Sequence, residues 1–148
     1  MSLRDASAVA GLSRAIQLSV APVFLLTGIG GLLGTFTARL SRIIDRTRLL
    51  QEAMERGNIA QAKRLKAVLI VQRRRLFLIN RAILCATVTA LLVSGVVAVL
   101  FISAVAAVDL ATIVVPVFVL AMVSLIAGLL LFLLEVQLAI SQNPPRYY

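Results

Sequence analysis

The sequence has no histidine and no tryptophan, and its one cysteine is Cys85. Without histidine the chain lacks the commonest general base and the commonest metal ligand. A single cysteine excludes a disulfide within the chain. The sequence also contains no phosphate-binding loop, no Cys/His cluster and no nucleophile beside a base. We therefore predict a protein that is not an enzyme and that holds no metal and no cofactor.

Acidic residues are scarce as well, with six Asp and Glu against fifteen Lys and Arg. Twelve of the fifteen lie between Arg39 and Arg81, where three acidic residues oppose them, so this segment accounts for the net charge of +9. A basic excess often indicates nucleic-acid binding. Here it lies between long apolar runs, where the positive-inside rule of membrane proteins explains it better. We expect no nucleic-acid partner and a cytoplasmic location for this segment.

Hydrophobic residues make up 61% of the chain, and its mean hydropathy is +1.03, well above the values of soluble proteins. An apolar run at 16–37 is long enough to cross the roughly 30 Å hydrocarbon layer as a helix. A second run at 82–134 has about twice the required length, and its one charged residue is Asp109. A turn at Asp109 predicts spans at 82–108 and 110–134. A break at Pro116 is the alternative, but it would leave Asp109 in lipid.

Residues 39–81, between the first two spans, have the pattern of two helices. No Gly or Pro occurs from Thr35 to Arg56, and Gly57-Asn58 supplies the one break. Heptad spacing on both sides of this break is typical of a coiled coil. The residues at this spacing are Ile43, Thr47, Leu50 and Met54 before the break, and Ala62, Leu65, Leu69, Gln72, Leu76, Ile79 and Ile83 after it.

The predicted fold class is therefore all-α: an integral membrane protein with three transmembrane helices and a cytoplasmic antiparallel helical hairpin between helices one and two. The hairpin covers 39–81 and turns at 57–58. A basic first loop places the N-terminus outside and the C-terminus in the cytoplasm. We treat 1–148 as a single membrane domain that ends in a loose tail at 141–148.

Four stretches of the sequence carry a resemblance to a known family. They are "APVFLLTGIGGLL" (21–33), "RLSRIIDRTRLL" (39–50), "RRRLFLINRAI" (73–83) and "FLLEV" (132–136). With these motifs the chain resembles the bacterial membrane family called domain of unknown function 2721. The resemblance implies a protein of the bacterial inner membrane with three helices. It implies no activity, cofactor or catalytic residue.

Small residues cluster in the first span: Gly28, Gly30, Gly31, Gly34 and Ala38. Glycine is unfavourable inside a helix in water, whereas small residues at a spacing of four let helix backbones approach closely in lipid. We expect these residues to pack against another helix, within one chain or between copies in a homo-oligomer. A flexible gate is the alternative reading.

A second line along the same helix continues from small and polar residues into arginines: Gln17, Phe24, Gly28, Gly31, Thr35, Arg39, Arg42 and Arg46. In a ring of identical subunits such a line could face a central pore with a basic inner mouth. The alternative is that Gln17 and Thr35 merely lie near the two membrane interfaces.

Glu135 follows the third span, at the depth where Arg39 and Arg81 flank the other two. A carboxylate at a membrane boundary is expected to be paired, and we predict an ion-pair clamp with Arg39, Arg42, Asn80 and Arg81 as its available partners. A proton or ion relay is the alternative. Other basic residues are largely unopposed and are expected to face lipid or a partner: Arg46, Lys63, Arg64, Lys66, Arg73, Arg74 and Arg75. Anionic headgroups attract such residues, and a cytoplasmic protein partner is the other candidate.

Together these features predict a homo-oligomer of the inner, or plasma, membrane that acts as a structural or interaction module. A channel-like pore lined by the first helix is the alternative function.

Overall fold

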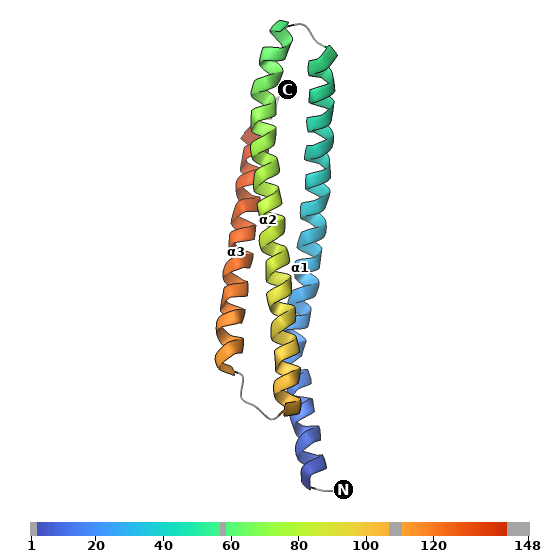
Figure 1. The fold of residues 1–148 in the computed structure, drawn as a ribbon, viewed down its shortest axis with the longest axis vertical. Helices are drawn as coiled ribbons and strands as arrows, with labels where there is room; N and C mark the ends of the chain where they lie inside the picture. The colour runs from blue at the N-terminus through green and yellow to red at the C-terminus, as the bar shows by residue number, and fades with distance from the viewer. Residues whose placement is uncertain (1–2, 57–58, 107–110, 142–148) are drawn as a thin grey trace, which may run out of the picture. The chain divides into compact units, whose positions relative to one another are not determined.

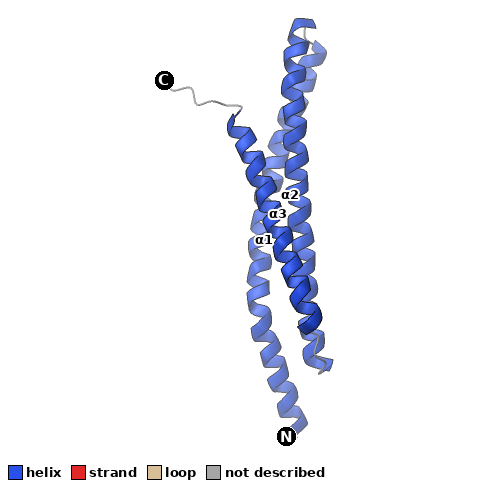
Figure 2. Cartoon of the chain, turned by 90° about the vertical axis from the view of Figure 1, so that its left-hand side faces the viewer, coloured by secondary structure: helices blue, strands red, loops and turns tan. Residues whose placement is uncertain are grey.

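The structure, a computed structural model, describes residues 3–56, 59–106 and 111–141, and each of these residues lies in an α-helix (Figure 2). Helix α1 is Leu3–Arg56, α2 is Ile59–Ala106 and α3 is Ala111–Ser141 (Figure 1). The predicted all-α class is confirmed. The predicted turns at 57–58 and at Asp109, and residues 142–148 of the predicted tail, lie outside the described residues.

Within the described ranges, three helical stretches are long and apolar enough to cross a membrane: Val9–Arg56, Leu65–Ala104 and Thr112–Ser141. Lipid offers the backbone no hydrogen-bond partners, so a crossing segment must satisfy its own N–H and C=O groups as a helix. The helix persists through Pro22 in α1 and Pro116 in α3, although each proline removes one backbone hydrogen bond. Pro116 therefore does not break the third helix.

The helices extend beyond the predicted spans. α1 begins at Leu3 and runs through the arginine-rich segment to Arg56, and α2 begins at Ile59, well before its apolar run. No helix-breaking residue separates the apolar and basic parts of either helix. The apolar and the basic side chains of α1, and likewise those of α2, therefore belong to one continuous helix.

The chain divides into two compact units, each built from parts of all three helices. Unit 1 comprises Met1–Leu32 and Ala86–Ile126. Its α2 segment buries small and β-branched residues at helical spacing, namely Ala86, Thr89, Val93 and Val96. Thr89 donates a hydrogen bond from Oγ1 to the carbonyl oxygen of Ala121 on α3, at 3.3 Å. Small side chains thus let α2 and α3 approach closely in this unit.

Unit 2 comprises Leu33–Cys85 and Ala127–Tyr148. Here the later part of α1 and the earlier part of α2 run antiparallel, side by side (Figure 1). Ile43 and Thr47 of α1 are buried, as are Leu69, Gln72 and Ile79 of α2. Every described position of the two predicted seams is buried or half-buried. This packing fixes the side of each helix that faces the site described next.

Candidate functional site

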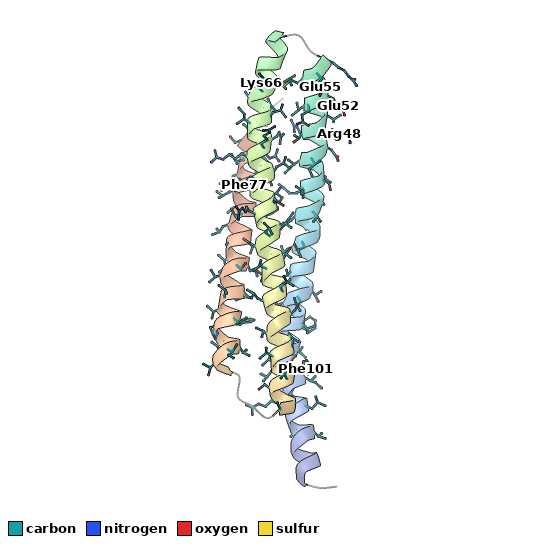
Figure 3. The ribbon with its side chains drawn as sticks, in the orientation of Figure 1. Arg48, Glu52, Glu55, Lys66, Phe77 and Phe101 are labelled. Atoms are coloured by element: carbon teal, nitrogen blue, oxygen red, sulfur yellow. The ribbon has the colours of Figure 1, made fainter. Side chains whose placement is uncertain are left out.

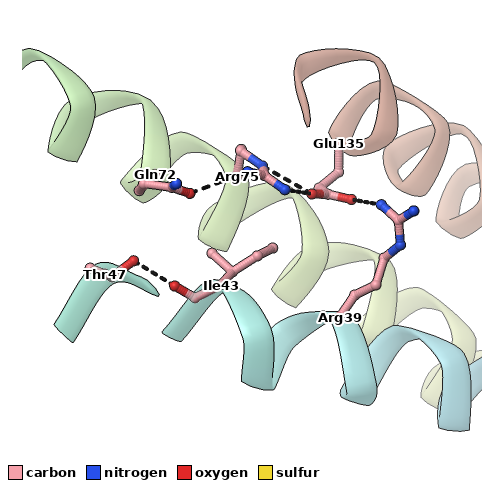
Figure 4. Close-up of polar contacts among 6 residues, drawn as sticks. All are labelled: Arg39, Ile43, Thr47, Gln72, Arg75 and Glu135. Atoms are coloured by element: carbon pink, nitrogen blue, oxygen red, sulfur yellow. Dashed lines mark hydrogen bonds and ion pairs between the residues drawn. The ribbon is translucent and has the colours of Figure 1, made fainter. Parts of the chain in front are cut away.

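Glu135 of α3 is the fully buried acid at the centre of unit 2, with 0% of its side chain exposed (Figure 4). Arg39 of α1 donates from Nη1 to Oε2 at 3.0 Å. Arg75 of α2 donates from Nη2 and Nε to Oε1, at 2.8 and 3.1 Å. One carboxylate therefore joins segments of all three helices. Charge-assisted bonds of this length are the stronger class of protein hydrogen bond.

Two aromatic rings support one side of this cluster. Phe36 and Phe132 stack with their centroids 4.5 Å apart, and the guanidinium of Arg39 lies 5.2 Å from the centre of the Phe132 ring. Phe36 precedes Arg39 by three residues, and Phe132 precedes Glu135 by three, so each pair lies on one face of its helix. One alignment of α1 against α3 therefore allows both the Phe36–Phe132 contact and the Arg39–Glu135 ion pair.

Gln72 positions the second arginine. Arg75 donates from Nη1 to Oε1 of Gln72 at 3.4 Å, one turn away on the same helix. Gln72 is 1% exposed, and its Nε2 has no hydrogen-bond partner among the described residues. A buried donor without a partner costs about 1–3 kcal/mol. The site thus tolerates an unfavourable polar group beside the arginine that Gln72 orients.

Arg75 corrects the sequence-based assignment, which placed it among the outward-facing basic residues. Its side chain is only 12% exposed and is bonded to Glu135. The signal lay in its spacing: Arg75 follows Gln72 by three residues and precedes Ile79 by four, so all three lie on the same side of α2. Within "RRRLF" the middle helix thus contributes one inward arginine.

The other predicted partners of Glu135 are not brought into contact with it. Arg81 is exposed and lies over the ring of Phe77, 5.2 Å from its centre, and Asn80 is exposed. Arg81 is nine residues from Gln72, which places it about 180° around α2 from the buried side. Arg42 shares a recess with Glu135 but forms no ion pair among the described residues. Of the two arginines predicted to lie at the depth of Glu135, Arg39 pairs with it. On α2 the partner is Arg75, six residues before the predicted Arg81.

The recess beside the clamp is a hollow of about 270 Å³. Four arginines contribute to its wall, together with one acid and two apolar residues: Arg39, Arg42, Arg46, Arg75, Glu135, Ile43 and Ala139. Its lining is therefore basic although it contains the buried acid. Within the described part of the chain, no group of three or more His, Cys, Asp or Glu residues could hold a metal ion.

The remaining basic candidates that the structure describes lie on the surface. Arg46, Lys66, Arg73 and Arg74 are exposed; the side chains of Lys63 and Arg64 are outside the description. Arg48 pairs with Glu52 at 3.3 Å, on the exposed part of α1 near its end (Figure 3). Exposed pairs of this kind contribute little to stability.

The predicted packing glycines point away from the rest of the chain. Gly28, Gly30, Gly31 and Gly34 are exposed, and a Cβ added at any of them would meet no described atom within 4 Å beyond the neighbouring turns of its own helix. Ala38 is exposed too. On the line proposed for a pore, Gln17, Phe24, Thr35 and Arg42 are exposed, and Arg39 is half-buried. Among the described residues, the four glycines therefore show no close approach of another helix.

Comparison with known proteins identifies a family for this chain. A family model described as "Protein of unknown function (DUF2721)" matches residues 19–143, which is most of the chain. No curated protein and no solved structure shows detectable similarity to the chain. The matched region includes Arg39, Arg75 and Glu135.

Unequal burial of the two arginines predicts unequal coupling to Glu135. Glu135→Gln should lower the free energy of unfolding by about 3–5 kcal/mol, because it leaves two guanidinium groups without their carboxylate. In double-mutant cycles, Arg75→Gln should couple to it by about 2 kcal/mol and Arg39→Gln by about 1 kcal/mol, within the range for contacting residues. Arg39 is the weaker partner because 38% of its side chain is exposed to solvent. Unfolding of purified protein in detergent micelles measures these values.

Arg81→Gln is the matched control, because it removes a guanidinium on the same helix that does not contact Glu135. Its effect should add to that of Glu135→Gln within about 0.5 kcal/mol. A coupling of Arg81 that exceeds the coupling of Arg75 would contradict the placement of α2 in this site.

Proposed function

The chain belongs to the DUF2721 family, and because the description of that family assigns no function, we propose one from the geometry. The protein is an integral membrane protein that assembles with copies of itself and acts as a structural or interaction module. Its basic helical hairpin contacts anionic lipid. The observation that carries this proposal is the contrast between one buried, neutralised acid, Glu135, and the surrounding exposed arginines.

Burial of Glu135 supports the lipid contact by removing the nearest counter-charge from the surface. Both of its oxygens are bonded to arginine, whereas Arg42, Arg46, Arg73 and Arg74 remain exposed. Basic residues close to an anionic membrane surface each contribute about 1 kcal/mol of attraction. The unit therefore presents uncompensated positive charge next to the apolar helix segments.

The basic segment also supports an orientation in the bacterial inner membrane. Lys and Arg concentrate on the cytoplasmic side of membrane proteins. With three crossings and the segment 39–81 inside, the N-terminus is outside and the C-terminus is cytoplasmic. The antiparallel parts of α1 and α2 then form a cytoplasmic hairpin.

Self-association is supported by the glycines of α1. Each glycine in a helix interior costs about 0.8–1 kcal/mol relative to alanine in water. In the described part of the chain, a Cβ added at Gly30 or Gly34 would meet no atom of another helix within 4 Å. Small residues spaced four apart let two helices pack closely in lipid, so a second copy of the chain is the partner that this face suits.

A channel-like pore is the second candidate, because the predicted pore line lies on an exposed side of α1. Gly31, Thr35 and Arg42 are exposed and could face an axis in an oligomer. Against it, Phe24 on the same line is 73% exposed and would narrow such an axis. The module is therefore the preferred function.

Neutralising arginines near the membrane should weaken the preference for anionic lipid. We expect Arg73→Gln with Arg74→Gln to lower the relative association of phosphatidylglycerol over phosphatidylcholine severalfold, up to roughly fivefold per charge. Spin-labelled lipids in reconstituted vesicles measure this ratio. Arg56→Gln is the control: it lies about 25 Å along α1 from Arg39, beyond the Debye length of roughly 8–10 Å. Equal lipid association in the wild type and the double variant would argue for a protein partner instead.

Leucine in place of the outward glycines should prevent self-association and leave the protomer folded. A Cβ at Gly30 or Gly34 meets no atom of another helix within 4 Å among the described residues, so Gly30→Leu and Gly34→Leu should change the unfolding of the monomer little. Sedimentation in detergent reports the oligomeric state. Gly95→Leu on α2 is the matched control, since a Cβ there also meets nothing. Oligomers that survive both α1 substitutions would exclude this face as the contact.

A conductance measurement separates the module from the pore. In the module, purified protein in planar bilayers gives no reproducible current, and Arg42→Glu creates none. In the pore, the wild type conducts anions in preference to cations, and Arg42→Glu reverses this selectivity because the charge at the inner mouth changes sign. Anion current with that reversal would establish the pore instead of the module.

A further inference from the structure

The recess beside Glu135 has a charge that the chain itself leaves unbalanced. Four arginines and one glutamate line it, which gives a formal charge of +3. Glu135 is engaged by Arg39 and Arg75 through both of its oxygens. Among the residues that the structure describes, neither Arg42 nor Arg46 forms an ion pair, and both are exposed. The recess therefore contains guanidinium groups that an outside anion could reach.

The arginines are arranged on one side of α1 in a way that concentrates this charge. Arg39, Arg42 and Arg46 are spaced by three and four, so they lie in a row along one helix face. Ile43 lies in the same row and is buried at 4% exposure, which anchors this face to the unit. The row is therefore held in place by the apolar packing beneath it and does not depend on the mobility of a loop.

A small residue on α3 creates the hollow opposite that row. Ala139 lines the recess one helical turn after Glu135. A larger side chain at this position would occupy the space in front of the arginines. The combination of an arginine row with a small residue facing it distinguishes this recess from a merely basic surface.

We propose that this recess binds one phosphate group, held chiefly by Arg42 and Arg46 with the outer N–H groups of Arg39. Guanidinium presents paired N–H donors that match phosphate oxygens and is less strongly hydrated than an ammonium group. The recess contains arginine as its only basic residue type. Its volume of about 270 Å³ is near the lower end of small-molecule sites, which suits a headgroup rather than a large cofactor.

The phosphate can come from a phospholipid headgroup or from inorganic phosphate, and the depth of the recess favours the first source. Arg39 ends the apolar part of α1, and Arg46 lies about 10 Å farther along the helix. The headgroup layer on each side of the hydrocarbon is roughly 5–8 Å thick. The row therefore spans the layer in which lipid phosphates lie. This step rests on the proposed membrane function, whereas the charge and shape of the recess do not.

The experiment uses the full-length protein with two probes. Native mass spectrometry of protein released from nanodiscs of phosphatidylcholine with a minor fraction of phosphatidylglycerol counts the phosphatidylglycerol that each chain retains. Calorimetric titration in detergent measures binding of inorganic phosphate. We expect the wild type to hold one phosphatidylglycerol, one phosphate, or either in competition. Arg42→Gln with Arg46→Gln should weaken binding about twenty-fivefold, at roughly fivefold per charge.

A variant that leaves every charge in place tests the shape of the site. Ala139→Leu should abolish binding of both probes by filling the recess. Ala53→Leu, on an exposed part of α1 outside the recess, should bind both probes as the wild type does. Arg73→Gln should bind inorganic phosphate as the wild type does, because Arg73 does not line the recess. Unfolding curves in detergent verify that each variant is folded. Unchanged binding in Ala139→Leu and in the double arginine variant would overturn the proposal.

Failure of this site is distinguishable from failure of the proposed function. If phosphatidylglycerol association depends on Arg73 and Arg74 but not on Ala139, the lipid-contact function stands and the recess site is wrong. If phosphate binding is lost in Ala139→Leu while the wild type shows no preference for anionic lipid, the recess site stands with inorganic phosphate as its source. The lipid contact of the hairpin is then wrong.

Discussion

The ion pairs of Glu135 are the constraint on which unit 2 depends. A carboxylate with 0% exposure has lost its hydration, and its burial is tolerable only with matched charges and hydrogen bonds. Arg39 and Arg75 supply both, and each comes from a different helix. Apolar side chains can shift past one another at little cost in free energy. The side chains of Glu135, Arg39 and Arg75 cannot, because a shift would break their ion pairs. The acid therefore fixes the relative register of α1, α2 and α3 in this unit, which is the specificity that buried polar groups can provide.

The same interaction determines the charge of the surface. Because the charge of Glu135 is buried and already paired with Arg39 and Arg75, it does not neutralise the neighbouring arginines. The lining of the recess in this unit is therefore basic. Arg39 has two roles here: one N–H group bonds to Glu135, while its side chain also lines the recess. The recess is therefore a consequence of the clamp. A change that released Arg39 would alter both the packing and the charge available to an anion.

Composition and hydropathy were sufficient to predict three helices, since lipid permits few other crossing structures. Burial of Ile43, Leu69 and Ile79 also follows from heptad spacing. The pairing of Glu135 with Arg39 could be expected from their common depth. Arg75 was missed because "RRR" was interpreted as a surface charge run, although its spacing from Gln72 placed it inside. The recess could not be predicted, because Ala139 leaves a hollow only where it faces the arginine row, and that depends on the packing of α1 with α3.

The two sides of α1 also bear on the proposed assembly. Phe36, Ile43 and Thr47 form its buried side in unit 2, and the clamp holds that side against α2 and α3. Gly34 and Ala38 lie roughly 160° around the helix from Phe36 at 100° per residue, so the clamp that fixes one side turns the small residues outward. Among the described residues, a Cβ at Gly34 would meet no atom outside its own stretch of helix within 4 Å. A second copy of the chain, which presents the same small-residue face, is the partner proposed for this side of α1.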